Sequence, residues 1–153
     1  MLIRKYQRLY LINCLPKRNI VALCPFLKQN LTIMTTQEVA DRFNELAQTG
    51  RFDLIQDELF SEDAESIEPP GIPGLKSVKG IDAIRQKEKD FNETVEEMHG
   101  GYATAPVVGG NLFSVGMGMD CTFKDMGRFN MQEIAVYEVK GGKIVKEQFF
   151  YTM

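Results

Sequence analysis

Residues 118–153 read GMDCTFKDMGRFNMQEIAVYEVKGGKIVKEQFFYTM, and this stretch decides the fold. Apolar and polar residues alternate as they do in strands with one buried face, over three runs: 117–123, 129–139 and 144–151. Turn-forming residues separate these runs, KDMG at 124–127 and KGGK at 140–143. Short turns between alternating runs predict a three-stranded antiparallel meander.

The predicted meander places acidic side chains on a face where apolar ones are expected. If the hairpin through residues 124–127 pairs symmetrically, Asp120 lies across from Glu133 on that face. Glu147 joins them only if the turn at 140–143 carries a bulge, because a plain two-residue loop turns its side chain to the other face. Carboxylates among Phe, Met and Tyr residues are more typical of a pocket wall than of a core.

Two opposed carboxylates point to acid–base chemistry. When both are ionised in a dry pocket they repel, so the pKa of one rises and a proton is held between them near neutral pH. A group of this kind works as a general acid or base. The alternative interpretation is that Glu133 and Glu147 are exposed on the outer face or pair with a nearby cation, since acidic residues are mostly exposed. The cations in question are Lys146, Arg128 and Lys143.

The composition predicts a single soluble domain without metal or cofactor. The 153 residues are 44% hydrophobic and 25% charged, enough for a sizeable core, and no apolar run is long enough to span a bilayer. The cysteines Cys14, Cys24 and Cys121 are odd in number and share no CxxC spacing, which disfavours disulfides and zinc and indicates a reducing compartment, the cytoplasm. His99 is the only histidine, and no phosphate-binding loop, dinucleotide fingerprint or nucleophile elbow is present.

Residues 1–33 form a separate segment by charge. They hold six basic residues and no acidic one, so their net charge is +6 while the remainder carries −9. A basic, partly apolar segment is compatible with an organellar transit peptide or a membrane-surface arm. We expect instead a poorly ordered extension outside the mature domain, because Met34 stands directly before a helix start and Pro16 and Pro25 interrupt any long helix. The folded domain, residues 34–153, is expected to bind neither membranes nor nucleic acid.

Helical spacing of apolar residues recurs three times before the meander. The first helix starts at Thr35 or Thr36 and stops at Gly50, the second covers 51–60, and the third covers 81–95, where the charged residues 85–90 are expected to form a solvated face. Strands are expected over 64–68, 96–104 and 111–123, with the Pro- and Gly-rich residues 69–74 as a loop.

This order of elements predicts an α+β fold. Helices that are segregated from an antiparallel sheet pack on one of its faces. A sheet that wraps around a long helix must be strongly curved, and glycines inside the strands (Gly100, Gly101, Gly116 and Gly118) are places where it can bend. We therefore expect a cone with one open mouth, with the N-terminal helices on the concave face of a mostly antiparallel sheet.

Two stretches resemble the SnoaL-like branch of the nuclear transport factor 2 (NTF2-like) superfamily: FSEDAESIEPPGIPGLKSVKGIDAI at 60–84 and EIAVYEVKGGKIVKEQFFY at 133–151. In that family a first strand ending in an acidic residue and proline is followed by a glycine that opens the third helix, and a Gly-Lys-Ile turn precedes the last strand. The resemblance covers residues 34–153. It implies a curved sheet, a pocket between the sheet and the helices, and a homodimer formed through the outer sheet face. It does not fix an activity, because the superfamily includes isomerases, cyclases, dehydratases and transport adaptors.

The resemblance also suggests catalytic residues. In the ketosteroid isomerase relatives the catalytic carboxylate comes from the end of the first strand, which makes Glu68 a candidate base, with Glu65 and Asp63 as rivals. Asp120 would supply the acid of an oxyanion hole, which also needs a tyrosine. That tyrosine is missing from its usual place in the first helix, where Phe43 is a nearby aromatic residue, and steroid-type isomerisation is therefore disfavoured.

The remaining candidates come from the strands and the first helix. His99 is included as a catalytic candidate because it titrates near neutral pH, although a lone strand histidine is more often a surface residue. For methionines such as Met117, core filling is the default, while a Met-rich lining would suit an adaptable apolar ligand. The expected ligand-binding residues are Glu147, Tyr102, Tyr151, Phe43 and Met117, and Tyr137 is a further hydroxyl donor.

Two functional interpretations stay open. The first is a cofactor-free isomerase, cyclase or dehydratase that moves a proton on a small, largely apolar carbonyl compound, with acid and base drawn from Asp120, Glu133, Glu68 and His99. The second is a noncatalytic module that binds a small ligand or dimerises through its sheet. The enzyme needs at least two ionisable groups that face an apolar cavity within hydrogen-bond reach of each other, whereas a binding protein tolerates groups that are already paired.

Overall fold

The computed structural model describes residues 33–70 and 75–151. The prediction for the basic extension falls outside these residues, apart from Ile33. Within them the helices are α1 (Thr36–Ala47), α2 (Phe52–Leu59) and α3 (Ile81–Thr94), close to the predicted ranges. A capping box starts α1, because the Thr35 hydroxyl accepts a hydrogen bond from the Glu38 backbone N–H while the Glu38 carboxylate accepts one from the Thr35 N–H. None of the described helices is both long and apolar enough to cross a membrane.

Seven strands form one sheet in the described part of the chain. They are β1 (Phe60–Ile67), β2 (Val78–Lys79), β3 (Val95–Ala103), β4 (Val107–Gly109), β5 (Leu112–Phe123), β6 (Gly127–Lys140) and β7 (Lys143–Phe150). The sheet order is β2-β1-β7-β6-β5-β3, and β4 pairs with β5. All neighbours are antiparallel except β1 and β7, which are parallel. The predicted α+β class, the mostly antiparallel sheet and the C-terminal meander, β5-β6-β7, are confirmed.

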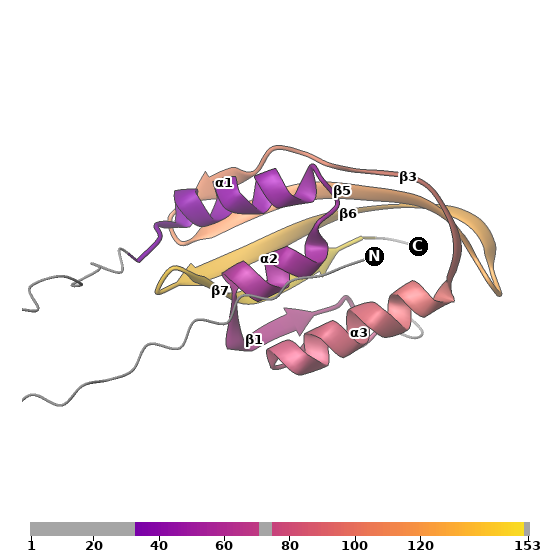
Figure 1. Cartoon of the computed structure of the whole chain (residues 1–153), viewed down its shortest axis with the longest axis horizontal. Helices are drawn as coiled ribbons and strands as arrows, with labels where there is room; N and C mark the ends of the chain where they lie inside the picture. The colour runs from indigo at the N-terminus through magenta and orange to yellow at the C-terminus, as the bar shows by residue number, and fades with distance from the viewer. Residues whose placement is uncertain (1–32, 71–74, 152–153) are drawn as a thin grey trace, which may run out of the picture. The chain divides into compact units, whose positions relative to one another are not determined.

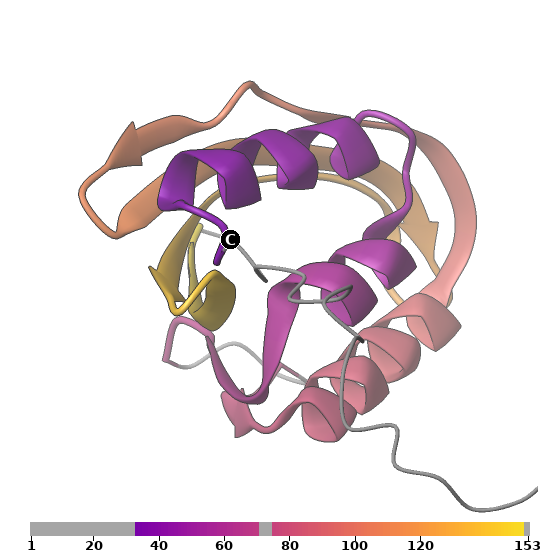
Figure 2. The ribbon, with the colours of Figure 1, turned by 60° about the vertical axis from the view of Figure 1, so that its left-hand side comes forward.

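The helices cover one face of a curved sheet (Figures 1 and 2). Helix α1 lies across β4, β5 and β6, while α3 packs along β1 and β2 at the other end of the sheet. Figure 2 shows β5 and β6 curving behind α1 and α2. Strand β3 carries two register irregularities against β5, between Val95 and Glu97 and between Met98 and Gly100, and bulges of this kind bend a sheet.

Aromatic packing joins α1 to the middle of the sheet. The Phe43 ring lies edge-on to Phe113 at 5.5 Å between centroids and tilted against Tyr137 at 4.7 Å, and Phe113 stacks on Tyr137 at 4.8 Å. All three side chains are buried. Burial of a Phe side chain contributes about 1.5–3 kcal/mol, so this cluster is a main element of the core.

The register of the β5–β6 hairpin differs from the predicted one. Phe123 pairs with Gly127, so the loop holds three residues, 124–126, rather than four. Consequently Asp120 pairs with Asn130, and Glu133 pairs with Met117. The predicted pairing of Asp120 with Glu133 is wrong: the partner of Asp120 lies three residues earlier on β6, and a register shift by an odd number of residues turns the side chains of a strand to the opposite face.

The β6–β7 hairpin contains the bulge on which the orientation of Glu147 depends. Its two-residue turn consists of Gly141 and Gly142, with φ of 61° and 77°, a conformation that glycine adopts without strain. The bulge lies beyond the turn, where β7 has one more residue than β6 between the pairs Val139–Ile144 and Glu138–Lys146. Glu147 therefore pairs with Tyr137 and is buried, and the alternative of an exposed Glu147 is wrong.

Candidate functional site

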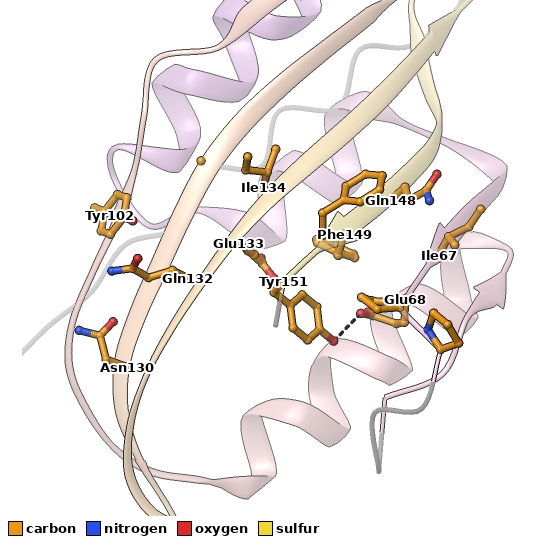
Figure 3. A pocket seen from close by; sticks show the side chains of 14 residues that line it. Ile67, Glu68, Tyr102, Asn130, Gln132, Glu133, Ile134, Gln148, Phe149 and Tyr151 are labelled. Carbon is orange, nitrogen blue, oxygen red and sulfur yellow. Dashed lines mark hydrogen bonds between the residues drawn. The ribbon is translucent and has the colours of Figure 1, made fainter. Parts of the chain in front are cut away.

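A pocket of about 1000 Å³ lies where β6 runs past the end of β7 (Figure 3). Phe150 at the end of β7 pairs with Ile134, so the first residues of β6 have β5 on one side and the pocket on the other. The wall contains four aromatic residues (Tyr102, Phe149, Phe150 and Tyr151), three amides (Asn130, Gln132 and Gln148) and two carboxylates, Glu68 and Glu133. The other described lining residues are Ile67, Pro69, Pro70, Gly116 and Ile134.

Glu133 titrates near neutral pH. It is half-buried on β6, and none of the hydrogen bonds among the described residues involves its carboxylate. Burial, and after it the negative charges of Glu68 and Glu147, raise the pKa of Glu133 to about 7, although the Lys87 ammonium opposes them. A carboxylate on a pocket wall with this pKa can both accept and return a proton at physiological pH.

Glu147 lies deeper than Glu133 and does not line the pocket. Its residue is 7% exposed, and its register partner across the parallel pair with β1 is the fully buried Ser66. Burial raises the pKa of Glu147 to about 7, although the Ser66 hydroxyl that hydrogen-bonds to it and the Lys87 charge lower it in part. Its partner on β6, Tyr137, has a pKa raised well above the usual value by burial, so this hydroxyl stays protonated.

Lys87 from α3 forms an ion pair with Glu68 beside the pocket. Its ammonium donates hydrogen bonds to Glu68 Oε1 and Ser66 Oγ, both at 2.5 Å, and lies 5.0 Å from the centroid of the Phe149 ring. The other oxygen of Glu68, Oε2, accepts a hydrogen bond of 3.0 Å from the Tyr151 hydroxyl (Figure 3). The side chains of Lys87 and Glu68 are only 14% and 6% exposed, so this is a buried ion pair.

Lys87 is not among the predicted site residues. The charged run at 85–90 was expected to face solvent, and this expectation is wrong for residue 87. A signal was present in the spacing: position 87 lies three residues after the buried Ile84 and four before Phe91, on the inward side of the helix. A lysine at such a position requires a buried partner, and Glu68 fulfils this requirement.

Asp120 and His99 lie away from Glu133. Strand side chains alternate between faces, so Asp120, paired with Asn130, points to the face opposite that of Glu133. It accepts two hydrogen bonds from Arg128, at 2.8 and 2.6 Å, and the Arg128 guanidinium lowers the pKa of Asp120. His99 Nε2 lies 2.7 Å from Thr122 Oγ1. Neither of these two catalytic candidates is among the residues that line the pocket.

The predicted ligand-binding residues divide into two groups. Tyr102 and Tyr151 line the pocket, and the Tyr102 ring lies directly against Gly118, so that a Cβ at this glycine would clash with it. Phe43 is 1% exposed and belongs to the core cluster, and Met117 packs against that cluster. Neither of these two is among the residues that line the pocket.

The comparisons with known proteins agree with this architecture. Residues 34–151 match the family model described as the SnoaL-like domain. The chain belongs to the SnoaL-like family. No curated protein matches the sequence significantly. The structure of a SnoaL-like protein from Mesorhizobium loti, named as a candidate polyketide cyclase, is 35% identical, with a TM-score of 0.72 over 77% of this chain and 100% of that one.

More distant structures share the fold of this SnoaL-like chain. An NTF2-like protein from Burkholderia thailandensis is 16% identical, with a TM-score of 0.66 over 78% of this chain and 92% of that one. A protein from Catenulispora acidiphila with a ketosteroid isomerase-like fold, solved in complex with trimethylamine, is 15% identical, with a TM-score of 0.59 over 78% and 88% of the two chains. These similarities show the NTF2-like fold and no activity.

Proposed function

We propose that this SnoaL-like protein is a cofactor-free acid–base catalyst that moves a proton on a small, largely apolar carbonyl compound, as isomerases, cyclases and dehydratases do. The observation that carries the proposal is Glu133, a carboxylate on the wall of a partly aromatic pocket with a pKa of about 7. General acid–base catalysis is most effective when the pKa of the catalytic group lies near the working pH.

Glu133 is assigned the role of base and then acid. It removes the proton from the carbon next to the carbonyl, the electron pair of that C–H bond forms the C=C bond of an enolate, and negative charge develops on the carbonyl oxygen. In the proposed reaction the Tyr151 hydroxyl, which donates its one hydrogen to Glu68 in the free protein, turns to donate it to that oxygen when the substrate is bound. Burial and the Glu68 carboxylate raise the pKa of Tyr151, so its hydroxyl stays protonated. Return of the proton from Glu133 to the same or another carbon completes the reaction.

Glu68 is assigned a positioning role rather than that of the base. Both of its oxygens are already engaged, one by Lys87 and one by Tyr151, so its carboxylate has little freedom to take a proton from a substrate. Its contribution is to hold the Tyr151 side chain next to the pocket and to keep its hydroxyl protonated. In this proposal Glu133, rather than Glu68, takes the role of base.

The same pairing supports a second candidate, a noncatalytic ligand-binding protein. A pocket whose polar groups are satisfied by one another can bind a ligand without chemistry, and Glu68, Lys87, Ser66 and Tyr151 form such a set.

The homodimer and the cytoplasmic location implied at the sequence level remain predictions. Leu112, an exposed apolar side chain of the sheet that does not line the pocket, is consistent with the former.

Hydrogen–deuterium exchange at carbon separates the two candidates. Small ketones are incubated with the protein in D₂O, and loss of the α-proton signal is followed by NMR. We expect the wild-type protein to accelerate exchange of at least one ketone, and Glu133→Gln to reduce the acceleration by a factor of about 10² or more. Glu138→Gln is the matched control, because Glu138 lies on the same strand, is half-buried, and contacts Asn111 rather than the pocket.

The outcome decides between the candidates. Exchange that is as fast with Glu133→Gln as with the wild type contradicts the assignment of Glu133 as base. Binding of ketones, seen as an increase in melting temperature, without any exchange supports the noncatalytic candidate.

A further inference from the structure

The wall of the pocket carries charge of only one sign. Of the described residues that line it, Glu68 and Glu133 are the carboxylates, and no lysine or arginine is among them. Lys87, the cation that lowers the pKa of Glu133, does not line the pocket and is held by Glu68 and Ser66 on the side of α3. Lys87 can balance one carboxylate, and Glu68 is the one to which it bonds. The charge of an ionised Glu133 is therefore left for a ligand to balance.

Aromatic side chains make up much of the remaining wall. Phe149 and Tyr151 come from the end of β7 and the residue that follows it, on the side of Glu133 (Figure 3). Tyr102 and Phe150 line the pocket from the other face of the sheet, because they lie in register with Gln132 and Ile134. The face of an aromatic ring attracts a cation, and the Phe149 ring already has the Lys87 ammonium 5.0 Å from its centroid. Carboxylate together with aromatic rings is the combination that binds alkylated ammonium groups, whose methyl groups are too apolar for a purely ionic site.

We propose that the pocket recognises an organic cation, an amine with small alkyl substituents, whose ammonium group lies at Glu133 and whose alkyl groups contact Phe149 and Tyr151. The inference deepens the proposed function by naming amino ketones as the substrate class. The carbonyl group of that substrate rests on the proposed function, whereas the ammonium group does not. Anionic ligands, such as free carboxylic acids, are excluded by the same charges.

Cation binding has a definite pH dependence. The groups around Glu133 are Glu68 from β1, Lys87 from α3, Tyr137 from β6 itself, Glu147 from β7 and Tyr151 beyond β7. Because the pKa of Glu133 is about 7, its charge is mostly absent at pH 6 and mostly present at pH 8. Affinity for a cation should therefore rise about tenfold over this interval, whereas affinity for a neutral ligand of the same shape should not.

Two ketones of equal shape provide the test. Trimethyl(2-oxopropyl)ammonium and 4,4-dimethylpentan-2-one differ in having N⁺ or C at the centre of the trimethyl group, and both have exchangeable α-protons. Dissociation constants are measured by NMR titration at pH 6 and pH 8, and α-proton exchange is measured in the same samples relative to buffer alone. At pH 8 we expect the cation to bind about tenfold more tightly than the neutral ketone.

Variants locate the charge that is responsible. Glu133→Gln should abolish the preference for the cation, Glu133→Asp should retain it, and Glu138→Gln should leave it unchanged. The inference is overturned if the two ketones bind equally, or if only the neutral one or neither binds. It is also overturned if the preference for the cation survives in Glu133→Gln. If the cation is preferred and no α-proton exchanges, the inference stands and the proposed catalytic function fails. If both ketones exchange their α-protons and bind equally, the catalytic function stands and the inference fails.

Discussion

Replacing Glu147 by glutamine should change how stability depends on pH. In the folded protein the pKa of Glu147 is about 7, against an ordinary value of 4.5. Between these two values the folded state binds more protons than the unfolded state, so stability falls as pH rises. At about 1.4 kcal/mol per pH unit, the wild type should lose about 2.5 kcal/mol of unfolding free energy between pH 5 and pH 8 through this residue. Glutamine mimics the protonated carboxyl and should remove this loss.

The assay is urea unfolding at pH 5, 6, 7 and 8, followed by circular dichroism, with the free energy obtained by linear extrapolation. The stability curve of Glu147→Gln should decline less with pH than that of the wild type by about 2.5 kcal/mol over this range. Glu138→Gln serves as the control and should keep the wild-type slope. Parallel curves for Glu147→Gln and the wild type would refute the reasoning, because they would mean that Glu147 titrates normally in the folded protein.

Three further substitutions test the assignments at other positions. Lys87→Met should destabilise the protein by about 3 kcal/mol at pH 8, since Glu68 would lose its buried partner, whereas Lys89→Met, at an exposed position, should leave the urea midpoint nearly unchanged. Phe43→Ala should cost about 3–5 kcal/mol in urea unfolding as expected for a core residue; a loss below 1 kcal/mol would contradict this placement. Asp120→Ala should leave ketone exchange unchanged, and a large loss of exchange would return Asp120 to the site.

Hydrophobic periodicity was sufficient to predict most of the fold. The spacing after Thr35 and the alternation in residues 117–151 depend on local geometry, and α1 and the β5-β6-β7 meander follow them. Strand β1 is longer than predicted, since it begins at the buried Phe60, next to α2, rather than at Ala64. The short strands β2 and β4 were not predicted, because two or three residues are too few to show a period.

The candidate site depended on details that periodicity does not determine. The Asp120 side chain lies on the face opposite the predicted one because the β5–β6 loop has three residues rather than four. A sequence pattern defines the ends of a turn only to within a residue or so. The orientation of the Glu147 side chain depended on a bulge in β7, and no residue type in the sequence indicates that bulge. Lys87 comes from a helix far from Glu68 in sequence, and only the packing of α3 on β1 brings the two together.

The central claim is that Glu133 titrates near neutral pH on the wall of the pocket, and NMR can measure this directly. The carboxyl ¹³C shift of Glu133, assigned by the signal that disappears in Glu133→Gln, is followed from pH 4 to pH 9 in protein labelled at glutamate. The account predicts a midpoint of about 7. A midpoint near 4.5, the value of an ordinary glutamate, would contradict it.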